Sequence, residues 1–242
     1  MIREALEFLC EKFTEAEGID TQCIDGDVYT RQKLVRIPVH VDHCAPFEVH
    51  SLSMLVKMVK HELTENHVFP LIVNVTDNKV VTVSSSLDVN KDRETVINCV
   101  ASIPQIPFGQ EMSPEQWIIQ LLTNFQQTDN CKKLQELLSS IVIDQKVEVS
   151  DNGFTQKVVA MDGAQIRRET TVQPLIKLVP ARTFTECKQP EQTFLVRVSK
   201  SGGITISDAS GGAFRKQCME SIEDYLSYQL EEEVKEGKVV IG

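Results

Sequence analysis

Residues 70–83 read Pro70-Leu-Ile-Val-Asn-Val-Thr-Asp-Asn-Lys-Val-Val-Thr-Val83. The runs 70–75 and 80–83 are rich in β-branched residues, and the polar segment 76–79 separates them. Two such runs around a short polar turn predict a β-hairpin, and therefore antiparallel strands. Segments of helical periodicity are grouped before and after these strands and do not alternate with them, so a parallel nucleotide-binding sheet is not expected.

The helices around this hairpin are marked by caps and apolar stripes. Ser51 is an expected N-cap, and an apolar stripe at helical spacing follows it: Leu52, Leu55, Val56, Val59 and Leu63. Residues 113–116 supply a cap, an N1 proline and an N3 glutamine, and the helix behind them is expected to bury Trp117, Ile118, Leu121, Leu122 and Phe125. A second amphipathic helix is expected at 129–141, and a last one from Ser210 or Gly211 to about Val234.

Further β-rich runs complete the expected fold. They lie at 34–41, 94–101, 146–149, 155–159, 169–172, 175–178, 193–198 and 203–207. We therefore expect an α+β fold with mixed, mostly antiparallel sheets, packed helices and a C-terminal amphipathic helix. Residues 1–30 are expected to form an N-terminal helix (2–13) and a polar segment, and 31–242 one domain with sub-domains 31–141 and 142–242.

The composition is that of an ordinary globular chain. The 242 residues carry 25 Lys and Arg against 35 Asp and Glu, a formal charge of −10. No apolar run approaches the ~18 residues of a membrane span, so we expect no membrane association. Seven dispersed cysteines without a CxxC pair favour a reducing cytoplasm, where thiols serve as small buried hydrophobes.

The charge is distributed unevenly along the chain. From 157 to 200 there are eight basic residues against four acids, a local charge of +4, whereas the tail from 218 has seven acids against two lysines, −5. A basic region of this kind suits phosphate or nucleic acid, although the net charge opposes an encounter with nucleic acid. Alternatively, the basic strands face solvent or an acidic helix of another identical chain.

Two further patterns suggest small sites. All five histidines lie between 40 and 67, and the run His40-Val-Asp42-His43-Cys44 offers the usual ligands of a transition metal. Ser201-Gly202-Gly203 and Ser210-Gly211-Gly212 have the look of anion-binding turns, the second before a helix. Ordinary surface histidines and tight turns explain both patterns equally well.

One stretch in the C-terminal half has an unusual composition. Pro174-Leu-Ile-Lys-Leu-Val-Pro180-Ala-Arg182-Thr183-Phe184-Thr-Glu186-Cys-Lys-Gln189-Pro190 precedes Phe194-Leu-Val-Arg197-Val, and Gly211-Gly212-Ala213-Phe214 follows. This order resembles the YfdQ-like family of phage and prophage proteins, over roughly residues 34–232. The resemblance implies a phage origin and transfers no catalytic residue. We expect a short strand at 183–186, and Arg182 to bind Glu186, Glu191 or an anionic partner.

The leading hypothesis is a non-enzymatic phage or prophage accessory protein of the host cytoplasm. It would act without a cofactor, by self-assembly as a homo-oligomer or by binding host or phage macromolecules in early infection. Candidate ligand- or partner-binding residues are Arg167, Arg168, Arg182, Glu186, Arg197, Gly211 and Gly212. One alternative is a nucleic-acid or nucleotide-binding factor of phage replication that uses these arginines and Lys157. Another is a metal-dependent enzyme at His40–His67, with His40, Asp42 and His43 as the candidate ligands.

Overall fold

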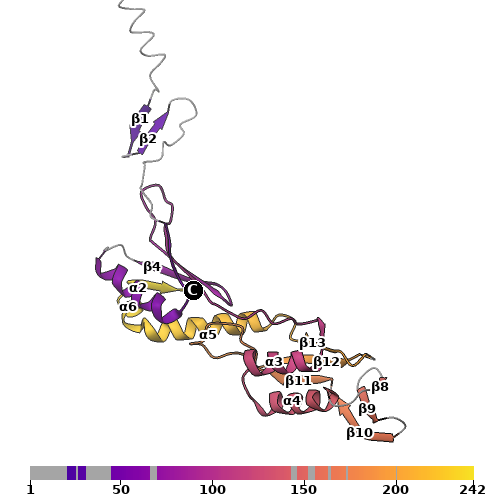
Figure 1. Ribbon diagram of the computed structural model, residues 1–242. Helices are drawn as coiled ribbons and strands as arrows, with labels where there is room; N and C mark the ends of the chain where they lie inside the picture. The colour runs from indigo at the N-terminus through magenta and orange to yellow at the C-terminus, as the bar shows by residue number, and fades with distance from the viewer. Residues whose placement is uncertain are drawn as a thin grey trace, which may run out of the picture. The chain divides into compact units, whose positions relative to one another are not determined.

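The computed structural model describes residues 21–25, 27–30, 45–65, 70–142, 146–151, 156–162, 165–172, 174–199 and 201–242 (Figure 1). The chain forms two compact units, one of Met1–Cys44 with Leu87–Glu94 and the other of Ala45–Ser86 with Thr95–Gly242. The helix expected at 2–13 and the strand expected at 34–41 lie outside the described residues. No described helix is both long and apolar enough to span a membrane.

The described residues of the first unit include a short hairpin. Its strands β1 (Thr21–Ile24) and β2 (Asp27–Thr30) pair antiparallel. The segment Leu87–Glu94 belongs to the same unit. In it, the Asp88 carboxylate accepts hydrogen bonds from the backbone amides of Asn90 and Asp92, both at 2.8 Å. This acid therefore organises its own turn, as short polar side chains commonly do.

The second unit is built first around a five-stranded sheet in the order β14-β4-β5-β6-β3. Its strands are β3 (Phe47–Val49), β4 (Leu71–Asp77), β5 (Val80–Ser84), β6 (Thr95–Val100) and β14 (Val239–Ile241). The predicted hairpin is confirmed, because β4 and β5 pair antiparallel with Val75 opposite Val81. The outer strands β3 and β14 instead pair parallel with β6 and β4.

Helices α2 (Leu52–Glu65), α5 (Phe214–Gln229) and α6 (Glu231–Lys235) pack on this sheet (Figure 1). Strand β4 alternates buried and more exposed residues, which is the pattern of a sheet with one covered face. The buried residues of β4, β5 and β6 form one hydrophobic core with those of α2 and α5. Ser51 caps α2 as expected, because its hydroxyl accepts from the Met54 amide at 3.3 Å.

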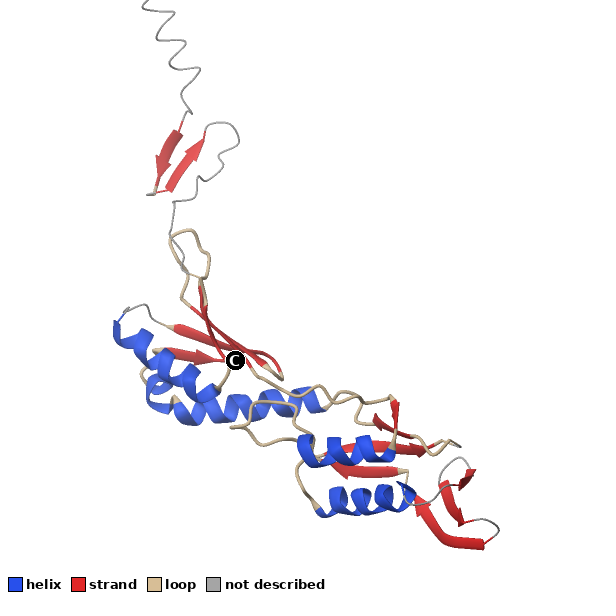
Figure 2. Cartoon of the chain, viewed as in Figure 1, coloured by secondary structure: helices blue, strands red, loops and turns tan. Residues whose placement is uncertain are grey.

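A four-stranded antiparallel sheet in the order β11-β12-β13-β7 forms the second core. Its strands are β7 (Glu111–Met112), β11 (Leu175–Leu178), β12 (Gln192–Val198) and β13 (Ile204–Asp208). Helices α3 (Pro114–Asn124) and α4 (Asp129–Val142) pack against it, as Figure 2 shows. The Trp117 indole donates to the Ile204 carbonyl at 2.9 Å, which ties α3 to β13.

The remaining strands form a three-stranded antiparallel sheet in the order β10-β9-β8. They are β8 (Lys146–Asp151), β9 (Gln156–Asp162) and β10 (Gln165–Val172). The register between β9 and β10 shifts between Ile166 and Arg168, which leaves Arg167 as the extra residue of a β-bulge. The fold as a whole is α+β, as expected, with mostly antiparallel sheets and a C-terminal helix.

Three local expectations were wrong. Leu122 was expected in the core, but it lies on the outer face of α3 and is exposed. The last helix was expected to begin at Ser210 or Gly211 and to run without interruption; α5 begins at Phe214, and Leu230 separates it from α6. Residues 183–186 form no strand, because their polar backbone groups bond to side chains instead of to a neighbouring strand.

Candidate functional site

Arg182 lies in the loop between β11 and β12, and its guanidinium forms an ion pair inside the protein. Its Nη2 lies 2.6 Å from Asp208 Oδ2 at the end of β13, and its side chain is only 8% exposed. Of the expected partners, Glu191 pairs with Lys177 at 3.4 Å, and Glu186 bonds to Ser53. The predicted pairing of Arg182 with Glu186 or Glu191 was therefore wrong, because the loop directs the guanidinium to β13.

Aromatic rings surround the same guanidinium. Its carbon Cζ lies 3.9 Å from the ring centroid of Phe214, 5.0 Å from that of Phe108 and 5.4 Å from that of Phe194. A guanidinium packed on aromatic faces gains cation–π attraction, which is larger where water is excluded. Nη1 is buried without a hydrogen-bond partner among the described residues. Arg182 is consequently not available to bind an anion from solution.

Asp208 is held in its charged form by its neighbours. Its Oδ1 accepts from the Ser210 backbone amide at 2.7 Å and from the Ser210 hydroxyl at 2.5 Å. Burial by itself raises the pKa of this carboxyl, but the hydrogen bonds from Ser210 and the interaction with Arg182 outweigh burial and lower the pKa. The pair is thus a salt bridge between two ionised groups.

Gln189 fixes the backbone of the Arg182 loop. Its Oε1 accepts from the amides of Arg182 at 2.8 Å and Thr183 at 3.1 Å. Its Nε2 donates to the carbonyls of Thr183, Phe184 and Cys187 at 3.3, 2.9 and 3.4 Å. One side-chain amide therefore replaces the strand neighbour that residues 183–186 lack.

The loop also contacts the elements of the five-stranded sheet. Glu186 Oε1 accepts from the Ser53 amide at 3.3 Å in the first turn of α2, where a carboxylate is favoured. The Asn78 side-chain Nδ2, in the β4–β5 turn, donates to the Arg182 carbonyl at 2.7 Å. Phe184 and Cys187 are buried in the first core, whereas Phe194 belongs to the second. The 181–190 loop therefore contacts both cores.

The other predicted binding residues do not gather around Arg182. Arg167 and Arg168 lie in β10, on a different sheet. Arg197 is half-buried in β12, on the face opposite Val196 and Val198. Gly211 and Gly212 are exposed and have positive φ values of 62° and 83°. They form a turn that only glycine adopts readily, and no side chain caps the helix behind them.

The histidine hypothesis is only partly covered by the structure. His40, Asp42, His43 and His67 lie outside the described residues. Of the others, His50 bonds through Nδ1 to the Val100 carbonyl at 3.0 Å, and His61 is exposed on α2. Among the residues that the structure describes, no three His, Cys, Asp or Glu side chains gather as a metal site would require.

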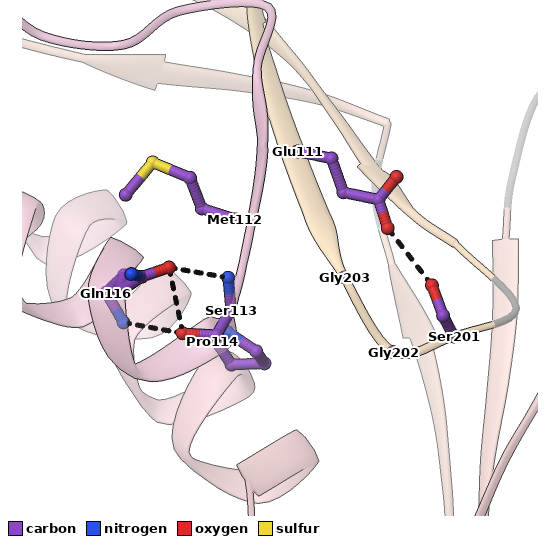
Figure 3. A pocket seen from close by; sticks show the side chains of 8 residues that line it. All are labelled: Glu111, Met112, Ser113, Pro114, Gln116, Ser201, Gly202 and Gly203. Atoms are coloured by element: carbon purple, nitrogen blue, oxygen red, sulfur yellow. Dashed lines mark hydrogen bonds between the residues drawn. The ribbon is translucent and has the colours of Figure 1, made fainter.

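A pocket of about 420 Å³ with both polar and apolar lining lies beside the start of α3 (Figure 3). Glu111 Oε1 accepts from the Ser199 hydroxyl at 2.6 Å and the Ser201 hydroxyl at 3.1 Å, and these bonds lower the Glu111 pKa. A Cβ at Gly203 would lie 2.0 Å from the same oxygen, so any other residue there would displace the Glu111 side chain from this position. A carboxylate in this position repels phosphate, which argues against the Ser201-Gly202-Gly203 turn as an anion site.

The edge strands of the two larger sheets carry exposed apolar side chains. Phe47 on β3, Leu175 on β11 and Val240 on β14 are 50%, 55% and 50% exposed, and within the described residues no strand pairs with the outer side of any of these strands. The interior strands β4, β5, β6, β12 and β13 carry no exposed large hydrophobic residue. An apolar strand edge is a template for pairing with another chain.

The backbone of β14 shows this most directly. The Leu71 and Val75 amides donate to the carbonyls of Lys238 at 2.9 Å and Gly242 at 2.8 Å, and the Gly242 amide donates to Val73. Parallel strands bond to a given neighbour through alternate residues. The N–H and C=O groups of Val239 and Ile241 therefore point away from β4, toward the open edge.

Sequence reasoning missed the residues that surround Arg182. Asp208, Phe108 and Phe214 are its neighbours, and all are at least 26 positions away in the chain. A buried arginine requires an anionic partner. The acid that directly follows the strand expected at 203–207, Asp208, was therefore the sequence signal that could have identified this partner. Comparison of the chain with protein-family models, with curated proteins and with solved structures finds no match.

Proposed function

We propose that this chain is an accessory protein of a phage or prophage that acts by assembling with further copies of itself and catalyses no reaction. The exposed apolar edges of β3, β11 and β14 carry the proposal. Natural proteins usually protect such edges with charged residues, proline or a covering element. A strand edge that exposes a large hydrophobic side chain in an isolated chain becomes covered when a second chain pairs with it.

The remaining features fit this role. The 181–190 loop, which is part of the 174–197 stretch that carries the resemblance to the YfdQ-like phage family, makes internal contacts. Arg182 and Glu186, the candidate ligand-binding residues of that loop, serve to join the two cores. Cys99, Cys131, Cys187 and Cys218 are free and buried, which suits the reducing cytoplasm of a host cell.

Solution mass tests this function. Light scattering after size exclusion is expected to give a multiple of the 27.2-kDa chain mass. Val240→Lys and Leu175→Lys are each expected to reduce that mass, because a lysine at a strand edge opposes pairing. Ile119→Lys is the matched control, since Ile119 is 53% exposed but lies on helix α3. A wild-type mass of one chain at every concentration examined would contradict the proposal.

A further inference from the structure

The three exposed strand edges differ in how well they are protected against pairing with another chain. Lysine and other charged residues, and proline, are the usual protections of a strand edge. Strands β11 and β3 each contain an exposed charged residue and directly follow a proline: Lys177 and Pro174 for β11, and Glu48 and Pro46 for β3. Strand β14 contains no charged residue and no proline, since it consists of two valines and an isoleucine. β14 is therefore the edge that is most open to pairing.

The outward backbone groups of β14 are arranged symmetrically about Val240. Lys238 and Gly242 bond to β4 through their backbones, and Val240 lies between them in the same alternation. The N–H and C=O groups of Val239 and Ile241 therefore face the open edge. The edge thus offers one donor and one acceptor on each side of Val240. Such an arrangement matches itself when the direction of the second strand is reversed.

An antiparallel second β14 uses all of these groups in one register. With Val240 opposite Val240 of a second copy, Val239 lies opposite Ile241 of that copy, and Ile241 lies opposite its Val239. Opposed residues whose N–H and C=O groups both point toward the other strand exchange two hydrogen bonds, so no group of this edge stays unpaired. Any other register places one of the two residues opposite a residue outside β14, or opposite Val240, whose own groups bond to β4.

The side chains of β14 fit the same register. Val239 is buried in the first core, and the partly buried Ile241 packs against that core. Because opposed residues share a face of the sheet, Ile241 meets Val239 of the second copy, and the core extends from one molecule into the other. Val240 lies on the opposite face, where it is 50% exposed, and it meets the same apolar residue. Lys238 lies opposite Gly242, so no like charges face one another.

From this self-complementarity we infer that β14 binds β14 of a second copy of the chain, antiparallel, about a two-fold axis at Val240. The inference rests on the proposed self-assembly, and it names the strand and the symmetry of the contact. The five-stranded sheets of the two copies then form one continuous sheet. The contact is isologous and closes on itself, so β14 alone produces a pair of chains, and a larger assembly requires other edges as well.

Disulfide formation in the full chain tests the two-fold axis. The Cα atoms of an opposed pair without mutual hydrogen bonds are about 4.5 Å apart, within the roughly 4.4–6.8 Å that a disulfide spans. Val240→Cys is therefore expected to link two chains in the presence of oxidised glutathione, with the bond between the two substituted positions in peptide mass spectrometry. Ile119→Cys, similarly exposed but on helix α3, is the matched control and is expected to form no such bond. The wild type gives the background from the native cysteines.

Ile241→Pro tests the backbone pairing. Proline removes the N–H of position 241, which faces the open edge, and leaves the groups that bond to β4. Light scattering after size exclusion is expected to show half of the wild-type mass, because each two-fold contact joins two copies. Ile241→Val keeps the amide and is expected to keep the wild-type mass. Circular dichroism checks the fold of each variant, and if Ile241→Pro is unfolded, the disulfide result alone decides.

The outcomes separate this inference from the proposed function. If the wild type is a single chain at every concentration, both fail. If the wild type assembles, Val240→Cys forms no disulfide and Ile241→Pro keeps the wild-type mass, only this inference fails, and the assembly uses other edges. If Ile241→Pro halves the mass but Val240→Cys forms no disulfide, β14 pairs with a different strand, and the two-fold contact is overturned. A disulfide with an unchanged mass of Ile241→Pro would overturn the pairing through the backbone.

Discussion

The Arg182 guanidinium and the Asp208 carboxylate lie 2.6 Å apart, from Nη2 to Oδ2. They join the 181–190 loop to the last residue of β13, while Asn78 and Glu186 join the same loop to the five-stranded sheet. The distinctive residues of the C-terminal half are thus explained by internal structure. The proposed self-assembly therefore uses the outer surfaces, namely the exposed strand edges of β3, β11 and β14.

Asp208→Asn is expected to destabilise the fold by about 3 kcal/mol, because it leaves a buried guanidinium without its counter-charge. Urea denaturation at neutral pH measures the loss. Lys177→Ala is the matched control: the Lys177–Glu191 pair is largely exposed, and such pairs contribute roughly 0–1 kcal/mol. An equal loss in both variants would contradict the interpretation of Arg182 as a buried ion.

The Arg182–Asp208 pair is expected to make the stability of the fold depend on pH in the acidic range. The folded-state pKa of Asp208 is lowered, below the ordinary aspartate value of about 3.9. Its contribution to stability is therefore complete above the ordinary pKa and is lost as the pH falls through the folded-state pKa. The difference in unfolding free energy between wild type and Asp208→Asn is expected to shrink below about pH 4. Denaturation curves from pH 7 to pH 3 check this; a constant difference would count against it.

Gln189→Ala is expected to cost roughly 2–3 kcal/mol, because it leaves several loop amides and carbonyls without a partner. Gln189→Glu keeps the acceptor but loses the donor to three carbonyls, so this variant is expected to be no more stable than Gln189→Ala. Gln105→Ala, at an exposed position before β7, serves as the control with little effect. Thermal melting of the three variants gives the comparison, and similar melting temperatures for all would refute the role of Gln189.

Cys99, Cys187 and Cys218 are expected to be unreactive in the folded protein. Burial, with a smaller contribution from Glu186, raises the pKa of Cys99 to about 12, and burial chiefly raises the pKa of Cys187 and that of Cys218 to about 11. Since the thiolate is the nucleophile, labelling of these residues by iodoacetamide at pH 8 is expected only after unfolding. Mass spectrometry of the labelled peptides, native against denatured, measures it. Labelling of Cys99 at equal rates in both states would contradict the burial.

Much of the local structure was predictable because it depends on neighbours in the chain. Ser113 and Gln116 form the expected reciprocal cap at the start of α3, since both partners lie within one helical turn. The helix expected at 129–141 appears as α4 with almost the same bounds. Leu122 was placed wrongly because α3 contacts the core through a narrower face than its apolar composition suggests.

Periodicity, turn chemistry and residue counts were enough to predict the α+β class, the hairpin, the helix caps and the opposed charges of residues 157–200 and 218–242. The burial of Arg182 beside Asp208, the role of Gln189 in place of a strand neighbour, and the exposure of Val240 and Tyr228 emerge only in the folded chain. Such partners are brought together by the packing of two cores, and no short-range pattern specifies a contact between residues so far apart in the chain.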